Sequence, residues 1–293
     1  MNKKTLTLKS YAKLNLFLQV RGKRADNYHT IQTVFERIDI HDRITLKDRS
    51  DRLITMQCSD PSLSVDESNL CVRSARLVQE KYAPGRGVDI ILTKHISIGA
   101  GMGGGSSNAA TVLAGLNALW KLNIPLPKLV GLGRRIGADV PFFLYDVSFA
   151  VGSGRGDSIK PLIVPRKTRF WHVVVVPRIH VSTPLIYREW DRFEGLTRPV
   201  SNVKLWSLLL QNYKVTDIGK SLFNALETVT ISRYPDVLRC REALIKSGID
   251  AVLMSGSGPS VFGITQSLKA ARSTACALTT YDSNWRIFVT KTV

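Results

Sequence analysis

The sequence predicts an α+β protein with two domains. Its 293 residues are many for one hydrophobic core and suit two. A glycine-rich stretch, 99–105, lies between a β-branched run and a helical pattern. Strand and helix patterns are mixed along the rest of the chain, which is typical of two α/β layers packed around a cleft.

The glycine-rich stretch has the composition of an anion-binding loop. Gly99 to Ala110 reads GAGMGGGSSNAA and holds five of the chain's 21 glycines. Glycine permits positive φ and lets the backbone lie close to a ligand. A helix after such a loop presents free N–H groups and the positive end of its dipole. We therefore expect a phosphate site. We expect Ser106, Ser107 or Asn108 to cap the first turn of that helix, and the simpler alternative is that the glycines only make a tight turn and Ser107 only caps.

Two better-known phosphate loops fit this stretch poorly. The Walker pattern needs a lysine before its Ser or Thr, and Gly105-Ser106-Ser107 has none. A dinucleotide fingerprint is formally present at Gly99, Gly101 and Gly104. Its acidic partner about 20 residues further on is missing, because 90–138 contains no Asp or Glu.

Local patterns predict the elements before and around the loop. Alternating apolar residues predict a strand over 14–20, and turn formers follow at 21–27. Pro141 pushes Val140 toward extended geometry. The other elements expected here are strands at 38–40, 44–46 and 88–93, a helix at 70–82 capped by the loop 66–69, a helix whose apolar residues are Val112, Leu113, Leu116, Leu119 and Trp120, and a helix that begins at Pro127 and ends at Gly137.

The second half of the chain is expected to be more helical. Glycines at 152–157 suit a domain junction, so we expect an N-terminal domain over 1–155 and a C-terminal α/β domain over 156–293. The patterns predict a buried strand at 173–176, helices at 205–210 and 237–246, and strands at 251–254 and 261–264 joined by a glycine turn at 255–260.

Composition narrows the class of protein. A hydrophobic fraction of 44% and a charged fraction of 22% are ordinary for a globular protein, and no apolar run is long enough to cross a bilayer. The N-terminus lacks the apolar core of a secretory signal. The four cysteines are scattered without a CxxC pair, so we expect reduced thiols, no zinc site and a cytoplasmic location.

The net charge of +18 leaves a nucleic-acid partner as an alternative. The basic residues are dispersed, however, and no nucleic-acid-binding motif occurs. We interpret the charge as a solvated basic surface that can also steer anionic nucleotides. The sequence leaves the oligomeric state open.

Three ordered segments resemble the motifs of the GHMP small-molecule kinases. They are Tyr11-Ala12-Lys13-Leu14-Asn15-Leu16, the glycine loop, and Met254-Ser255-Gly256-Ser257-Gly258-Pro259-Ser260. The resemblance runs from about residue 10 to 263. It departs at Asn27, Ser97, Met102 and Ala225. It implies a two-domain fold with the active site in the cleft between the domains.

Two further segments resemble one branch of that family. They are 24–30, which contains Tyr28 and His29, and 137–143, which contains Asp139. The resemblance implies ATP-dependent phosphorylation of the 2-hydroxyl of 4-diphosphocytidyl-2-C-methyl-D-erythritol, a precursor in the non-mevalonate isoprenoid pathway. The alternatives are a kinase of the same fold that acts on homoserine, a sugar or mevalonate, a basic nucleic-acid-binding protein, and a silent regulator.

The resemblance also implies roles for individual residues. Lys13 and Asp139 are the expected catalytic pair; from the residues alone, Asp139 can equally cap a turn, and Lys13 with Asn15 can face solvent on a half-buried strand. Mg²⁺ is expected with ATP, with Ser107 as a possible ligand. The expected ATP-binding residues are Asn69, Lys94, Gly99, Ala100, Gly101, Met102, Gly103, Gly104, Gly105, Ser106 and Ser107. The expected substrate-binding residues are Asn15, Tyr28, His29 and Thr183.

Overall fold

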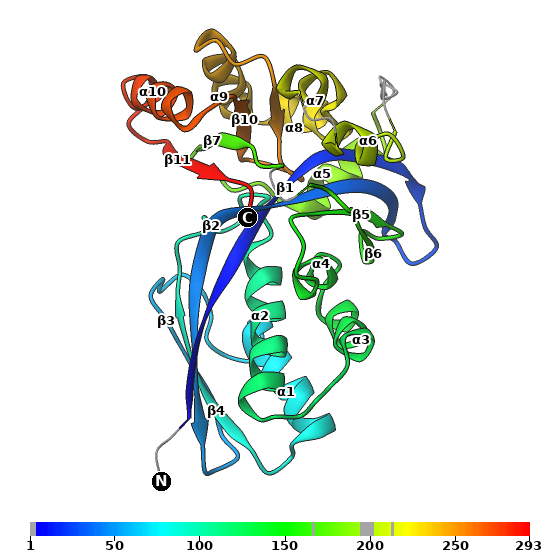
Figure 1. Cartoon of the computed structure of the whole chain (residues 1–293), viewed down its shortest axis with the longest axis vertical. Coiled ribbons are helices and arrows are strands. Elements are labelled where there is room, and N and C mark those ends of the chain that lie inside the picture. Colours follow the sequence, from blue (N-terminus) through cyan, green and yellow to red (C-terminus); the bar gives the residue numbers. More distant parts are fainter. Residues whose placement is uncertain (1–3, 166–167, 194–201, 212–213) are drawn as a thin grey trace. The chain divides into compact units, whose positions relative to one another are not determined.

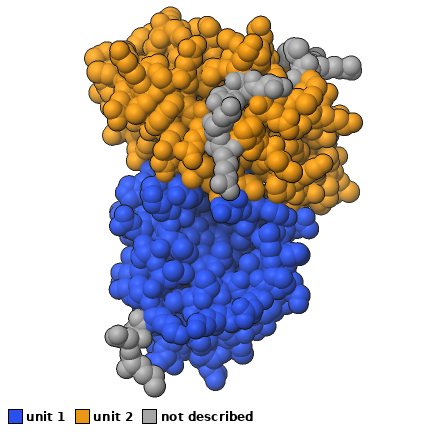
Figure 2. Space-filling view, viewed as in Figure 1, with its two compact units in different colours: residues 1–12, 40–98, 103–146 blue, residues 13–39, 99–102, 147–293 orange. Residues whose placement is uncertain are grey.

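The computed structural model describes residues 4–165, 168–193, 202–211 and 214–293 (Figure 1). The chain forms two compact units, coloured separately in Figure 2. Unit 1 contains the chain up to Ala12, then Ile40–Ile98 and Gly103–Asp146, and unit 2 contains Lys13–Asp39, Gly99–Met102 and Val147–Val293. Each unit is therefore built from several segments. The division of the chain at residue 155 stays a prediction.

Unit 1 consists of a sheet with helices on one face. Strands β1 (Thr5–Lys23) and β2 (His29–Arg49) contribute residues to both units, and β3 (Ile54–Cys58) and β4 (Gly87–Thr93) complete the sheet of unit 1. β4 pairs antiparallel with β2 and parallel with β3. The helices are α1 (Leu70–Tyr82), α2 (Gly104–Leu119), α3 (Leu126–Ile136) and α4 (Val140–Leu144).

The core of unit 1 lies between α2 and the sheet, and Figure 1 shows α1 beside α2. Ile44 and Leu46 of β2 stand opposite Leu92 and Ile90 of β4, and all four are buried. The predicted apolar stripe of α2 is buried as well, so its helical spacing is confirmed. Residues 38–40 and 44–46 belong to one long strand rather than two, because the polar residues 41–43 between them are extended as well.

Two local expectations are wrong. Helix α2 begins at Gly104, and its N-cap is Gly103 with φ +69° and no side-chain capping bond. Ser106, Ser107 and Asn108 therefore lie inside the helix and do not cap it. Val140 is the first residue of α4 rather than extended. Pro141 occupies the first turn, where a missing N–H costs nothing, and this outweighs its steric effect on Val140.

Unit 2 contains a second sheet, with strands in the order β11-β7-β10-β9, all antiparallel. The strands of unit 2 after residue 146 are β5 (Phe149–Ser153), β6 (Ser158–Pro161), β7 (Trp171–Val176), β8 (Phe223–Asn224), β9 (Val252–Met254), β10 (Val261–Thr265) and β11 (Arg286–Lys291). Its helices are α5 (Thr183–Trp190), α6 (Trp206–Gln211), α7 (Val215–Ser221), α8 (Glu227–Arg233), α9 (Pro235–Lys246) and α10 (Leu268–Thr279).

A second hydrophobic core joins this sheet to its helices. It contains Val173, Val175 and Val261 from the strands and Leu244 and Leu278 from α9 and α10. β8 pairs in parallel with β1 at Phe17 and Leu18. The glycine-rich segment 152–157 contains the end of β5 and the turn 154–157 of the β5–β6 hairpin within unit 2. Among the described residues, no helix is both long enough and apolar enough to cross a membrane.

The cysteines allow a direct test of these cores. Burial raises the pKa of the Cys71 thiol to about 12, and burial likewise raises the pKa of Cys240 to about 12. Cys276 is exposed. Since the thiolate is the reactive species, we expect iodoacetamide to alkylate Cys276 in the folded protein and to spare Cys71 and Cys240. Peptide mass mapping measures this; the same reaction in urea should modify all three, and alkylation of folded Cys71 as fast as Cys276 would contradict the packing.

Candidate active site

The first half of the glycine loop, residues 99–102, is held by hydrogen bonds that its backbone carbonyl oxygens accept from other segments. Ser260 Oγ donates to the carbonyl oxygen of Ala100 at 2.5 Å, and Ser255 Oγ donates to that of Gly101 at 3.1 Å. The backbone N–H of Lys13 donates to the carbonyl oxygen of Met102 at 3.0 Å. Segments far apart in the sequence therefore fix the path of this half of the loop.

Two features of position 101 require a glycine. Its φ is +73°, a conformation that side chains disfavour. A Cβ atom here would lie 2.2 Å from the carbonyl oxygen of Ser255. The loop and the turn 255–260 thus approach each other within unit 2 as closely as bare backbone permits.

The turn 255–260 is itself supported by Asn224. The Asn224 side chain donates from Nδ2 to the carbonyl oxygens of Met254 and Gly256, each at 2.8 Å, and accepts from Leu226 N at 2.9 Å. Glu227 accepts the N–H of Met254 at 2.8 Å, and burial raises the pKa of Glu227 above its usual range. Asn224 therefore positions this turn.

Lys13 and Asn15 are buried side by side in β1. Their exposed fractions are 3% and 1%, so the alternative in which they face solvent is wrong. Lys13 Nζ donates to Asn15 Oδ1 and lies 5.6 Å from the ring centroid of Phe35. Asn15 Nδ2 donates to Thr33 Oγ1 at 2.7 Å, and Asn15 N donates to Ser255 Oγ at 3.3 Å. Lys13 is therefore joined to the first half of the glycine loop through its backbone N–H, and its ammonium is held by Asn15.

Asp139 belongs to unit 1, whereas Lys13 belongs to unit 2. Asp139 is the residue before α4, and its side chain makes no capping hydrogen bond to that helix. A Cβ atom at Gly137 would lie 3.8 Å from Ser106 Oγ, so the segment that leads to Asp139 runs past the first turn of α2. The capping alternative for Asp139 therefore has no support in the geometry of α4.

Tyr28 and His29 differ in their surroundings. Tyr28 is 55% exposed, with the Arg155 guanidinium 5.1 Å from its ring centroid. His29 is buried, stacks on Tyr187 at 4.8 Å between ring centroids and bonds through Nε2 to Asp191 Oδ1 at 2.7 Å. Tyr28 thus offers an exposed aromatic surface, and His29 has a fixed ring.

Asp191 remains charged beside His29. Burial raises the pKa of this carboxyl, but the hydrogen bond from His29 and the contact with Lys23 at 3.3 Å outweigh it, so the pKa lies below its usual range. Thr183, the first residue of α5, shares a hydrogen bond of 2.7 Å with Ser257 Oγ. The start of α5 is thereby joined to the turn 255–260.

Asn69 and Lys94 both have protein partners. Asn69 is the N-cap of α1, where Oδ1 accepts from Cys71 N at 2.9 Å and Nδ2 donates to the carbonyl oxygen of Ser64 at 2.7 Å. Lys94 forms a buried ion pair with Asp42 at 2.6 Å. Their expected role near the adenine of ATP stays a prediction.

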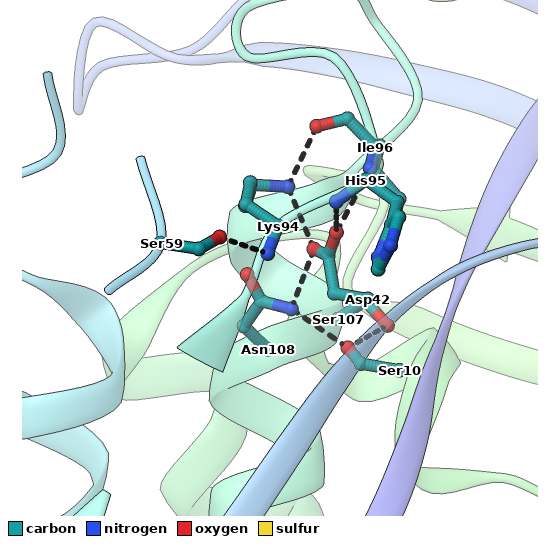
Figure 3. Close-up of polar contacts among 8 residues, drawn as sticks. All are labelled: Ser10, Asp42, Ser59, Lys94, His95, Ile96, Ser107 and Asn108. Atoms are coloured by element: carbon teal, nitrogen blue, oxygen red, sulfur yellow. Dashed lines mark hydrogen bonds and ion pairs between the residues drawn. The ribbon is translucent and has the colours of Figure 1, made fainter. Parts of the chain in front are cut away.

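The second half of the glycine loop begins helix α2 in unit 1. Figure 3 shows the polar network beneath it. A Cβ atom at Gly104 would lie 3.0 Å from Lys94 Nζ, so the Lys94 ammonium packs against the first residue of the helix. Ser107 Oγ lies 2.8 Å from Ser10 Oγ, and Ser10 Oγ accepts from Asn108 Nδ2 at 2.9 Å. Sequence reasoning singled out neither Asp42 nor Ser10, because a polar residue in a strand has no distinctive spacing.

The described residues contain no group of three or more His, Cys, Asp and Glu side chains that could hold a metal ion. The predicted site instead offers hydroxyls, backbone groups and the carboxylate of Asp139. Such a donor set fits a magnesium ion that is held mainly by phosphates and water.

Family comparisons agree with the motifs. The profile described as GHMP kinases N terminal domain matches residues 69–146, and GHMP kinases C terminal matches residues 209–283. A 4-diphosphocytidyl-2-C-methyl-D-erythritol kinase from Chlorobium phaeobacteroides is 40% identical over 278 residues, which are 93% of this chain and 91% of the relative. One from Bacillus pumilus is 39% identical over 258 residues, or 88% and 87% of the two chains.

Solved structures are similar over nearly the whole chain. A crystal structure of 4-(cytidine 5'-diphospho)-2C-methyl-D-erythritol kinase has a TM-score of 0.82 and 34% identity, covering 98% of this chain and 100% of the other. Homoserine kinase from Cytophaga hutchinsonii has a TM-score of 0.73 and 18% identity, covering 100% and 96%. At that identity the second likeness concerns the fold alone.

The close approach at Gly101 leads to a prediction about stability. We expect Gly101→Ala to destabilise the protein by about 1–3 kcal/mol, because it combines a positive φ with a steric clash. Gly131→Ala is the matched control, since Gly131 lies within α3 with nothing near its Cβ position; alanine there should stabilise by about 0.4–1 kcal/mol. Urea unfolding measures both, and equal midpoints for the two variants would refute the close approach.

Proposed function

Since the chain belongs to the GHMP kinase family, in its 4-diphosphocytidyl-2-C-methyl-D-erythritol kinase branch, we propose that it phosphorylates the 2-hydroxyl of 4-diphosphocytidyl-2-C-methyl-D-erythritol with ATP. The observation that carries this proposal is the placement of Lys13. Its backbone bonds to Met102 of the glycine loop, and its buried ammonium bonds to Asn15. A buried, held cation on a residue whose backbone bonds to a glycine loop can balance the charge that develops in phosphoryl transfer.

The proposed reaction is a direct transfer. The substrate hydroxyl oxygen forms a bond to the γ-phosphorus while the bond from that phosphorus to the bridging oxygen breaks, and ADP leaves. Asp139 accepts the hydroxyl proton, and Lys13 stabilises negative charge on the transferred group. The free N–H groups at the start of α2 bind phosphate oxygens. Magnesium bound to ATP would neutralise phosphate charge, with the Ser107 hydroxyl as a candidate ligand.

The proposed substrate site uses groups that are already held in place. Tyr28 presents its exposed ring for stacking on the cytosine. His29 is fixed by Asp191 and Tyr187, so its ring orientation is set before the substrate arrives. Asn15 and Thr183 complete the set, each bonded to a serine of the turn 255–260.

The remaining parts of the proposal concern the ATP-binding domain and the location of the protein in the cell. Residues 1–155 form the proposed ATP-binding domain, with Asn69 and Lys94 near the adenine, and 156–293 form the C-terminal domain. Cys58, Cys71, Cys240 and Cys276 are free thiols, which fits the proposed cytoplasmic location.

Turnover tests the proposal directly. We expect ADP release from ATP and Mg²⁺ with 4-diphosphocytidyl-2-C-methyl-D-erythritol, and none with homoserine, galactose or mevalonate. Asp139→Asn should lower kcat by roughly 10²–10⁴-fold, because it removes the proton acceptor. A coupled assay for ADP measures both.

Asp236→Asn is the matched control, since it makes the same change in the exposed first turn of α9. It should turn over like the unmodified protein. Turnover with another acceptor would refute the proposed substrate but not the proposed kinase activity. Full activity in Asp139→Asn would refute the catalytic role of Asp139.

The support of His29 by Asp191 gives a separate prediction. Asp191→Ala should raise the KM for the cytidyl substrate about tenfold and leave the KM for ATP unchanged, because it frees the His29 ring. Lys23→Ala removes the other, more exposed partner of Asp191 and should change little. Steady-state kinetics with each substrate varied in turn decides; a parallel rise in both KM values would count against the assignment.

A further inference from the structure

A fully buried carboxylate lies beneath the predicted phosphate loop. Asp42, in the part of β2 that belongs to unit 1, is 0% exposed. Its Oδ1 accepts the backbone N–H groups of His95 and Ile96 at 2.7 and 2.8 Å. Its Oδ2 accepts from Lys94 Nζ at 2.6 Å and from Asn108 Nδ2 at 2.9 Å. Figure 3 shows these four donors converging on the one carboxylate.

Stability alone does not account for this arrangement. Burying a carboxylate and an ammonium is costly, and well-packed apolar residues often stabilise a core as well or better. What distinguishes Asp42 is where its partners lie. His95 and Ile96 lie four and three residues before Gly99, the Lys94 ammonium packs against Gly104, and Asn108 follows Ser107. Asp42 thus ties the segment before the loop to the first turn of α2.

The chemistry of the carboxylate also sets the direction of the hydrogen bonds that Asn108 makes, the first links of a chain that runs to Ser107. An ionised carboxylate only accepts, so Asn108 turns its NH₂ group toward Asp42. The second N–H of that group donates to Ser10 Oγ. Ser10 then accepts from Asn108 and has its own hydrogen to donate to Ser107 Oγ, 2.8 Å away. Hydrogen bonds that run in one direction strengthen one another.

We propose that Asp42 is a positioning residue for phosphate recognition, acting through Lys94 and through the chain Asn108–Ser10–Ser107. The Ser107 hydroxyl accepts from Ser10 and so directs its own hydrogen to a phosphate oxygen. The Lys94 ammonium fixes the start of α2, whose free N–H groups bind the same phosphates. This inference rests on the proposed function, because it assumes that the loop binds ATP.

Binding of ATP without acceptor tests the inference apart from the choice of acceptor. Asp42→Asn should weaken the Kd for ATP with Mg²⁺ by roughly 10- to 100-fold in titration calorimetry, because the ionised acceptor is lost. In turnover the same variant should raise the KM for ATP and leave the KM for the cytidyl substrate unchanged. If Asp42 only supported the fold, its substitution would not change the KM for ATP while leaving the KM for the cytidyl substrate unchanged.

Ser10→Ala is the second variant, since it removes one hydroxyl from the chain and leaves Asp42 paired. We expect the Kd for ATP to rise about three- to tenfold. In a Ser107→Ala background, Ser10→Ala should have no further effect, because Ser10 acts through Ser107. Thr7→Val is the matched control: it removes a hydroxyl from the same strand, where Thr7 Oγ1 and Thr45 Oγ1 form an exposed pair at 3.0 Å.

The outcomes separate the two proposals. If the unmodified protein does not bind ATP, both the proposed function and the inference about Asp42 are refuted. If it binds ATP and both Asp42→Asn and Ser10→Ala bind equally well, the inference alone is refuted. Independent effects of Ser10→Ala and Ser107→Ala would refute the hydrogen-bond chain. Should Asp42→Asn fail to fold, the Ser10 and Ser107 variants still decide.

Discussion

A carboxylate can be buried only where donors replace the water it loses. At Asp42, which is wholly buried, four donors meet this requirement, and each comes from a segment next to the glycine loop. The geometry of unit 1 around this loop depends on that requirement. The strand that carries Asp42, the residues before the loop and the first turns of α2 share one set of hydrogen bonds, so a shift of one of them breaks the bonds of the others.

Most of the fold could be predicted from local patterns. Helix α1 spans the predicted residues 70–82 with Asn69 as its cap, and α3 ends where Gly137 was expected to end it. Periodicity and capping chemistry are properties of neighbouring residues, so a single sequence reveals them. The start of α2 could not be predicted in the same way, because a glycine with positive φ, rather than a side chain, begins the helix.

The site was predictable only in part. The motifs identified Lys13, Asn15 and the glycine loop, and the structure joins these through Met102 and Ser255. The supporting residues Asp42 and Asn224 could not be found, since their partners lie far away in the sequence and no spacing marks them. The roles of Lys13 with Asp139, and of the residues proposed for ATP and substrate, stay predictions.

The glycine loop depends on parts of the chain that leave the ribosome at very different times. The hydrogen bonds on its helix side join residues between Ser10 and Asn108, so all of these residues have been synthesised once residue 108 is added to the chain. The contacts of its first half require Ser255 and Ser260, which lie 154 and 160 residues after Gly101 and Ala100, the loop residues to which they bond. Because domains fold as they emerge, a nascent chain can complete the network around Asp42 while the carbonyls of Ala100 and Gly101 still lack their donors. Half of one short loop is thus among the earliest parts of the site to be completed, and the other half is among the last.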